Sequence, residues 1–485
     1  MLPSAIKQLA PLLADVAGSF ASGQAVAQYA VPAVATKGGL FGGKRVTVPM
    51  SEPLPGVDVP KYSAPAPAKL ETGSIEGVKA AAVDTGGPNV ALAVFVGSGS
   101  ANETPETAGA SKLLEYMAFS ATNNRSTFRL TRELEKYGAA AAALAGRESI
   151  AYGVEGTKLQ AAEVTEMLLD AVLNMRLNYW EINDMLPHVQ ADMERAYAQP
   201  TALATELLHR AAFSGGLAQP LLPDPETLAS LTPEAVHAFV AEHFTAANIT
   251  LAAAGATLPA VTNAAAPLIA AAARPGGGGG AAGATGKYTG GVLCALSPAT
   301  VPVVALAYAA PGGLGDAKAT ALAAVIKALL NETREVLPYM HKEPSGALGS
   351  VIPIVHVYKS TGLIGLLGTP SEKGAPAAVD SMSARFEALA KGVAEPALAA
   401  AKGVALGGYQ AATATKSGAV QELAQQLLTR GKASTGDYAA AVAGITAADV
   451  SAAVGAMLKG APTLVAAGPL SELPKYDAVA KRFAS

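Results

Sequence analysis

The chain has 485 residues, and its 35 basic and 38 acidic side chains nearly balance. This balance argues against a nucleic-acid surface as the main partner, and the single Cys294 excludes both an internal disulfide framework and a cysteine-based zinc site. Charged residues make up only 15% of the chain and hydrophobic residues 51%. We therefore expect partner proteins to cover part of its surface, unlike that of a free monomer.

The first 40 residues contain two lysines, Lys7 and Lys37, and one acidic residue, Asp15, and no arginine occurs before position 45. Their larger apolar residues recur on one helical face. The pattern is typical of a mitochondrial transit peptide, and the alternative is a frayed amphipathic arm. No window of about 20 residues is continuously apolar, so we expect membrane contact only through partners.

Residues 46–68 are rich in proline, which predicts an irregular lead-in. Hydrophobic periodicity then predicts a mixture of strands and helices up to residue 254. The predicted strands are 89–97, 139–145, 149–155 and 248–254, and the predicted helices are one around Lys112, then 127–137, 159–177, 180–197 and one after the N-cap Thr232.

A second half repeats this order. A strand at 301–308, a glycine-containing loop and a helix at 320–330 match the strand, loop and helix near residue 100. The helix that ends at Leu458 and the strand 463–467 repeat the segment 231–254, displaced by 214 positions (445 − 231 = 214). We therefore predict an α+β fold made of two homologous sheet-plus-helices domains.

Composition suggests the domain boundaries. We expect a transit peptide or flexible arm at 1–45, a first domain at 46–259, an Ala/Gly-rich linker at 260–287, a second domain at 288–476 and a tail at 477–485. The linker holds five consecutive glycines, Gly276–Gly280, which are costly to order in a helix or strand.

The helix around Lys112 carries an altered metal motif. Lys112, Glu115 and Tyr116 stand at positions i, i+3 and i+4 and therefore share a helix face. The inverted zinc motif His-x-x-Glu-His has this spacing, with two imidazoles as ligands and a Glu that activates water. Here Lys112 and Tyr116 replace both imidazoles. An ammonium has no lone pair for a metal, and a phenol must first lose a proton with a pKa of about 10.

The segment Ala108-Gly-Ala-Ser-Lys-Leu-Leu-Glu-Tyr-Met-Ala-Phe119 resembles the zinc-site helix of the pitrilysin-type metallopeptidases. This family includes the mitochondrial processing peptidase and the two core proteins of ubiquinol–cytochrome c reductase, respiratory complex III. Segments between Trp180 and Phe244, such as Arg195-Ala-Tyr-Ala-Gln-Pro200, resemble the core 2 branch more than the catalytic subunit. The resemblance extends over residues 55–475, is weaker in the second half, and implies a clamshell of two halves.

The resemblance also places a third zinc ligand 76 positions after the second, which here is Asp192 (192 − 116 = 76). All three ligand positions are therefore altered, and we expect no bound metal, no cofactor and no catalytic residue. We predict a degenerate site of Lys112, Glu115, Tyr116 and Asp192. In it, Lys112 replaces the charge of the metal and pairs with Glu115 or Asp192, because a buried carboxylate without a partner is costly.

The other candidate sites have structural explanations. His237 and His243 are six positions apart and point to different helix faces. Gly312-Gly-Leu-Gly315 follows a strand and precedes a helix, but it lacks the Lys-Ser/Thr of a P-loop and repeats the turn Gly97-Ser-Gly99. The sequence has no Gly-x-Ser-x-Gly nucleophile elbow and no ligation pattern for haem or an iron–sulfur cluster.

Two functions remain open, because the altered ligand positions argue against a third, an autonomous peptidase. The resemblance favours a non-catalytic core subunit of complex III, peripheral to the inner mitochondrial membrane on the matrix side. Such a subunit pairs with a homologous core or processing-peptidase β-like subunit, contacts other complex III subunits and joins a dimeric complex. The alternative is the α-type, substrate-holding and zinc-free subunit of the processing peptidase, which in some lineages is itself a complex III component. That subunit carries a glycine-rich loop, but the matching residues 331–349 are not glycine-rich, which favours the core subunit.

Overall fold

The computed structural model describes residues 68–272, 286–295, 302–331, 348–370, 374–468 and 473–482. The expected transit peptide or arm at 1–45 and the glycines Gly276–Gly280 lie outside these residues. Most of the segment 331–349, whose composition favoured the core subunit, also lies outside them.

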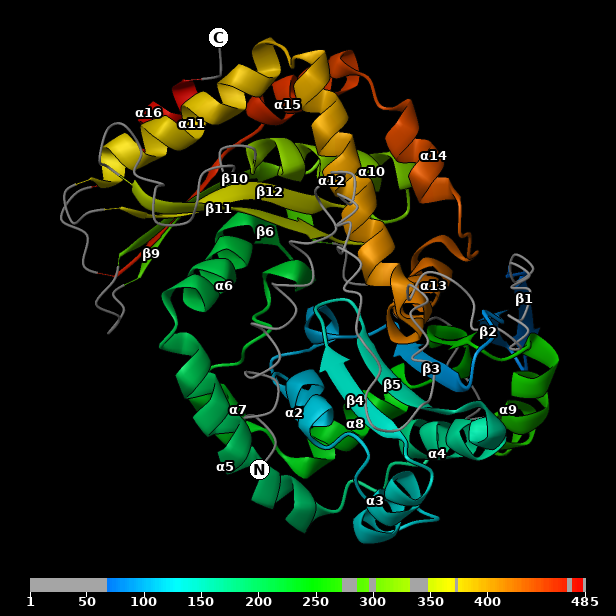
Figure 1. Ribbon diagram of the computed structural model, residues 1–485. Coiled ribbons are helices and arrows are strands. Elements are labelled where there is room, and N and C mark those ends of the chain that lie inside the picture. The colour runs from blue at the N-terminus through cyan, green and yellow to red at the C-terminus, as the bar shows by residue number, and fades with distance from the viewer. Residues whose placement is uncertain are drawn as a thin grey trace, which may run out of the picture. The chain divides into compact units, whose positions relative to one another are not determined.

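The first half is built on a six-stranded sheet with the order β1-β2-β7-β3-β5-β4 (Figure 1). Its strands are β1 (Leu70–Ile75), β2 (Val78–Val83), β3 (Asn89–Val96), β4 (Ala140–Ala145), β5 (Ile150–Thr157) and β7 (Ile249–Ala254). Strands β2 and β7 are parallel, and the other neighbours are antiparallel. The central strands β3 and β7 are buried almost throughout, which explains their continuous apolar sequences.

Seven helices share the main core of this half. They are α2 (Ala110–Tyr116), α3 (Thr127–Lys136), α4 (Ala161–Leu173), α5 (Tyr179–Tyr197), α7 (Pro225–Ser230), α8 (Pro233–His243) and α9 (Leu258–Ala272). The N-cap expected at Thr232 is present, because its side chain accepts a hydrogen bond from the amide of Ala235.

The second half has a five-stranded sheet with the order β11-β12-β10-β13-β9. Its strands are β9 (Gly291–Ala295), β10 (Val303–Ala309), β11 (Leu348–Val357), β12 (Gly362–Pro370) and β13 (Thr463–Ala467). The helices of its core are α10 (Ala317–Leu330), α11 (Ala375–Lys391), α12 (Glu395–Ala414), α14 (Asp437–Gly444), α15 (Ala447–Leu458) and α16 (Tyr476–Lys481).

The two sheets repeat one topology. Read from the other edge, the order β9-β13-β10-β12-β11 matches β2-β7-β3-β5-β4 strand for strand. The pair β13 and β9 is parallel, as is the matching pair β7 and β2, and the remaining pairs are antiparallel in both sheets. The predicted α+β class, with two sheet-plus-helices halves, is confirmed.

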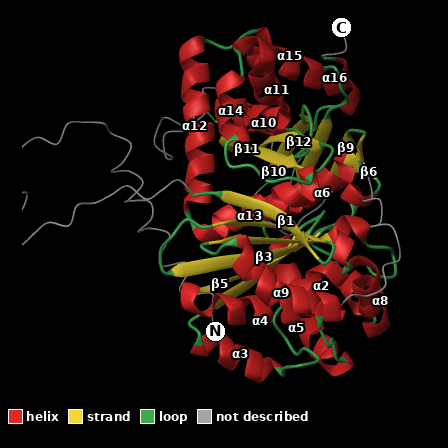
Figure 2. Cartoon of the chain, turned by 90° about the vertical axis from the view of Figure 1, so that its right-hand side faces the viewer, coloured by secondary structure: helices red, strands yellow, loops and turns green. Residues whose placement is uncertain are grey.

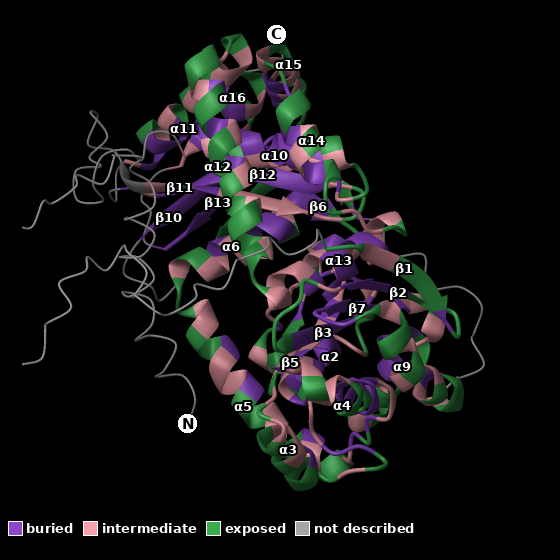
Figure 3. Cartoon of the chain, turned by 45° about the vertical axis from the view of Figure 1, so that its right-hand side comes forward, coloured by how far each residue is buried: buried purple, intermediate pink, exposed green. Residues whose placement is uncertain are grey.

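Each half lends one helix to the sheet of the other half (Figure 2). Helix α6 (Pro200–Ala212) packs on the second sheet, where Leu208 meets a cluster that includes Val465. Helix α13 (Lys416–Arg430) packs on the first sheet, where Leu423 meets alanines of β3 and β7. Both sheets are therefore buried layers between helices (Figure 3).

Two expected boundaries are wrong. The segment 260–287 does not begin as a linker, because α9 continues to Ala272 and buries Val261, Ala265 and Ile269 beside the first sheet. The residues after 476 do not form only a tail, because α16 reaches Lys481 and buries Val479. Alanine-rich and short helices lack the large apolar residues that make a periodic pattern visible.

In addition, the short strand β8 (Lys287–Tyr288) pairs with β6 (Phe213–Ser214) of the first half.

The two glycine turns predicted as structural repeats lie at equivalent places. A Cβ atom on Gly99 would stand 2.2 Å from the carbonyl oxygen of Gly146, in the turn between β4 and β5. A Cβ atom on Gly313 would stand 2.4 Å from the carbonyl oxygen of Lys359, in the turn between β11 and β12. Close approach of two backbones therefore explains both glycines.

No single helix in the described ranges is long and apolar enough to cross a membrane. The pair α14 and α15 passes that test only when its two helices are taken together, and they are bent by 90°.

A histidine pair, one buried and one half-buried, lies where α6 contacts the second sheet. The rings of His209 and His356 are 4.9 Å apart. His209 Nδ1 lies 2.7 Å from the carbonyl oxygen of Thr205, which can only accept, so its Nε2 accepts from the hydroxyl of Tyr358 at 2.6 Å. Burial, and then the positive charge of Arg147, lowers the pKa of His209 well below its usual value and that of His356 to about 4.

This pair predicts acid lability. Between pH 6.5 and 4 the unfolded chain protonates His356 while the folded chain keeps it neutral. As the pH is lowered through this range, His356 therefore lowers the free energy of unfolding, by up to about 1.4 kcal/mol per pH unit. His356→Phe removes this contribution, and its urea-unfolding free energy should fall less steeply over that range than that of the wild type. His188→Gln, at an exposed histidine, should keep the wild-type slope. Equal slopes for His356→Phe and the wild type would contradict the assignment.

Candidate functional site

Helix α2 carries three of the four predicted site residues. It begins after Gly109, whose φ is 90°, and the carboxylate of Glu103 accepts hydrogen bonds from the amides of Gly109 and Ser111 at 2.8 Å each. These bonds satisfy donors that a helix start leaves free, and they place a negative charge at the positive helix end. Leu113 and Leu114 are fully buried, so the side of the helix that carries Lys112, Glu115 and Tyr116 is fixed.

Lys112 and Glu115 form an ion pair. The ammonium of Lys112 lies 3.0 Å from each carboxylate oxygen of Glu115, and the two side chains are only 12% and 17% exposed. Oε2 of Glu115 also accepts a hydrogen bond of 2.8 Å from the amide of Ala145, at the end of the edge strand β4. The carboxylate that would activate water in the zinc motif is therefore bound by an ammonium and a backbone amide.

Tyr116 and Asp192 meet across α2 and α5. The hydroxyl of Tyr116 donates to Oδ2 of Asp192 at 2.7 Å, and Arg195, one turn along α5, pairs with Oδ1 at 2.7 Å. Burial, and then the hydrogen bond to Asp192, raises the pKa of the Tyr116 phenol. The phenol therefore remains a proton donor and does not offer a metal the phenolate that coordination requires.

The donor set does not fit zinc. The three ligand positions hold an ammonium, a protonated phenol and one carboxylate, whereas zinc needs three or four lone pairs from imidazole, thiolate or carboxylate. No group of three or more His, Cys, Asp and Glu that could hold a metal occurs in the described ranges. Lys112 and Arg195 balance Glu115 and Asp192, so these four charges sum to zero without an ion.

The structure brings together all four predicted residues, and Lys112 has one of the two partners that were expected for it. Sequence reasoning missed three supporting groups: the carboxylate of Glu103, the amide of Ala145 and the side chain of Arg195. Only Arg195 left a usable signal, because it lies three positions after Asp192 on one predicted helix. The histidines His237 and His243 each contact backbone or packing neighbours rather than each other.

Lys112→Met tests the ion pair, because methionine keeps most of the side-chain volume and removes the charge. Glu115 then loses the only cation it pairs with in the described chain, and we expect the free energy of unfolding in urea to fall by about 1–3 kcal/mol. In the double variant Lys112→Met/Glu115→Gln no uncompensated charge remains, so much of this loss should return. If the double variant is as unstable as Lys112→Met, charge compensation is not the role of Lys112.

Comparison with known proteins places this geometry in context. Residues 79–224, which include all four site residues, match the insulinase family of peptidases, family M16. The probable alpha-2 subunit of the mitochondrial-processing peptidase of Arabidopsis thaliana is 28% identical over 96% of both chains. The alpha subunit of that peptidase from Solanum tuberosum is 29% identical over 93% of this chain and 94% of its own length.

Subunit 2 of the mitochondrial cytochrome b-c1 complex of Rattus norvegicus is 27% identical over 86% of this chain and 95% of its own length. The family resemblance predicted from the sequence is therefore confirmed: an M16 peptidase segment carries the altered motif, and the chain is similar along most of its length both to processing-peptidase alpha subunits and to subunit 2 of the cytochrome b-c1 complex.

Proposed function

We propose that this chain is a non-catalytic structural core subunit of ubiquinol–cytochrome c reductase, peripheral to the inner mitochondrial membrane on the matrix side. The observation that carries the non-catalytic part of the proposal is the Lys112–Glu115 ion pair at the position of the zinc motif. The choice of a core subunit rests on the sequence of residues 331–349, which is not glycine-rich. A zinc peptidase needs a metal-bound water and a free carboxylate to activate it. Here the ligand positions cannot hold the metal, and the carboxylate is already engaged. The chain's contribution is therefore the surface that it offers to other subunits.

The exposed surface supports a role in assembly. Large hydrophobic side chains remain in water on the described chain, among them Phe128 at 70%, Tyr179 at 63% and Leu159 at 90% exposed. Aromatic residues of this kind are enriched at protein–protein interfaces. The partners we propose are a homologous core or processing-peptidase β-like subunit and other complex III subunits, within a dimeric complex, and contact with the membrane passes through these partners.

The second candidate is the α-type subunit of the mitochondrial processing peptidase, which holds substrate while its partner supplies zinc. The length of the similarity favours this candidate, because two alpha subunits align with at least 93% of this chain and the rat cytochrome b-c1 subunit with 86%. The same altered site fits both candidates, because neither role requires this chain to bind zinc. The two differ in what is lost when the chain is removed.

Depletion of the chain separates the two candidates. Mitochondrial membranes are extracted in mild detergent from cells with a tagged copy of the chain, and from cells in which the chain is depleted. The core-subunit proposal predicts that the chain co-migrates with ubiquinol–cytochrome c reductase activity and that depletion lowers this activity while presequence cleavage persists. Loss of presequence cleavage with intact reductase activity would instead establish the α-type role.

A matched variant tests the absence of catalysis in the same cells. Glu115→Gln keeps the size of the side chain and its capacity to accept from the amide of Ala145, but removes the group that a peptidase would use to activate water. Because neither candidate assigns chemistry to Glu115, presequence cleavage by the purified assembly should be unchanged. Loss of cleavage in Glu115→Gln, with the assembly still intact by size-exclusion chromatography, would show that this chain is itself a peptidase.

A further inference from the structure

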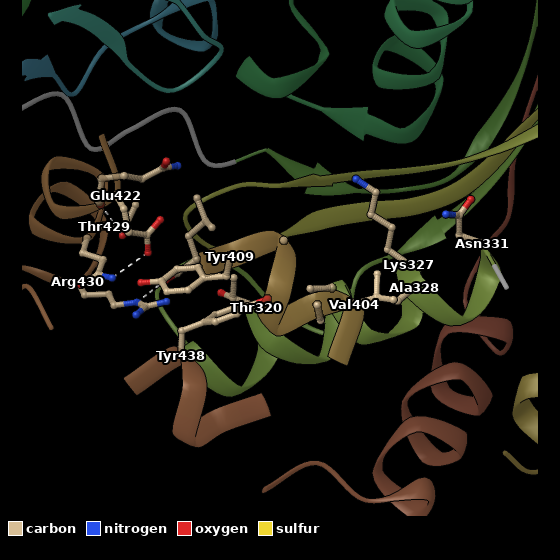
Figure 4. A pocket seen from close by; sticks show the side chains of 16 residues that line it. Thr320, Lys327, Ala328, Asn331, Val404, Tyr409, Glu422, Thr429, Arg430 and Tyr438 are labelled. Carbon is tan, nitrogen blue, oxygen red and sulfur yellow. Dashed lines mark hydrogen bonds between the residues drawn. The ribbon is translucent and has the colours of Figure 1, made fainter. Parts of the chain in front are cut away.

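A cavity of about 380 Å³ lies in the second half, between α10, α12, α13 and the start of α14 (Figure 4). Sites for small ligands in proteins typically measure about 300–1,000 Å³ and combine apolar walls with a few polar groups. None of the four altered-site residues lines this cavity. It is therefore separate from the position of the zinc motif.

The middle of the cavity is apolar and includes a glycine of α12, Gly408. Ala324 and Ala328 of α10 face Val404, Ala405 and Gly408 of α12 across it. No atom of the described residues lies within 4 Å of the place where a Cβ atom on Gly408 would stand. A side chain at position 408 would therefore occupy space that glycine leaves open.

Polar groups lie at the two ends (Figure 4). Lys327 and Asn331 lie at one end, and Arg430, Glu422 and Tyr409 at the other. Thr320 and Lys327 are seven residues apart on α10, which corresponds to roughly 10 Å along the helix axis. The cavity therefore suits an elongated molecule with an apolar body and a polar group at one end or at both.

The cations of the cavity remain available, whereas its carboxylate is engaged. Nε of Arg430 donates to the carbonyl oxygen of Leu314 at 2.8 Å, which fixes the plane of the guanidinium. Its terminal amines and the ammonium of Lys327 have no hydrogen-bond or ion-pair partner among the described residues. Glu422 accepts from the buried amide of Gln426 at 2.7 Å. A guanidinium held in this way presents a fork of donors that matches a carboxylate or a phosphate.

Tyr409 adds a second donor beside Arg430. Burial, and then the charge of Glu422, raises the pKa of its phenol to about 12. The ring also stacks on Tyr438 at a centroid distance of 4.2 Å, which limits the rotation of the side chain. The phenol hydroxyl therefore stays protonated and held at the same end of the cavity as the guanidinium.

We propose that this cavity binds a small organic anion with an extended apolar body, such as a medium-chain carboxylate or phosphate monoester. The anionic group lies at Arg430 and Tyr409, and the body extends past Gly408 along α10 towards Lys327. The inference goes beyond the proposed function and does not depend on which complex the chain joins.

Isothermal titration of the full-length chain tests this proposal with three probes of one chain length: octanoate, octyl phosphate and octylammonium. The anions should bind with 1:1 stoichiometry and octylammonium should not, and the ratio of the two anion affinities identifies the preferred head group. Arg430→Gln keeps a donor near Leu314 and removes the charge, so it should weaken binding of the anions about ten-fold or more.

Two glycine variants separate occupation of the cavity from general effects on the helix. Gly408→Leu fills the cavity, whereas Gly403→Leu adds the same side chain to the same helix outside the cavity. At either position, no atom of the described residues lies within 4 Å of the new Cβ atom. Leucine favours a helix over glycine, so neither variant should melt below the wild type. Anion binding should vanish in Gly408→Leu and persist in Gly403→Leu. Equal binding by both variants, equal binding of octylammonium, or no binding of either anion would overturn the proposal.

Discussion

The carboxylate of Glu115 is mostly withdrawn from water on α2, and a charge in such a place needs a positive partner at short range. In a zinc peptidase with this motif the metal ion is close enough to be that positive partner. Here the partner is the ammonium of Lys112, from the preceding turn of the same helix. Arg195 does the same for Asp192, and Tyr116 joins the two helices through its hydrogen bond. The residues at the positions of the metal site still lie together on α2 and α5. The positive charge that a metal ion would supply comes instead from Lys112 and Arg195.

The elements that hold the altered site depend on packing between the two halves. Strand β4, whose last amide holds Glu115, belongs to a sheet whose inner face is covered by α13 of the second half. Helix α6, which follows α5 and Asp192, is in turn buried on the second sheet. Because each half completes the core of the other, the altered site is supported by elements from both. The two halves belong to one compact unit, although their sheets repeat one topology.

The features that could be predicted from the sequence are those that depend on the spacing of residues along the chain. Lys112, Glu115 and Tyr116 follow from helix geometry, and the repeat followed from matching strand, loop and helix patterns. Asp192 came from the family resemblance, because no local rule joins residues 76 positions apart. Glu103 and the amide of Ala145 could not be predicted, because their roles depend on a loop path and on the position of an edge strand. Helix α9 was missed because alanine buries well without producing a visible hydrophobic period.

The most direct test of the account is the zinc content of the purified wild-type chain after dialysis against a small excess of zinc and then against buffer. Charge replacement at the motif predicts far less than one zinc per chain, with the same low content in Asp192→Asn. One tightly held zinc per wild-type chain that is lost in Asp192→Asn would contradict the account, because it would show that this constellation coordinates a metal after all.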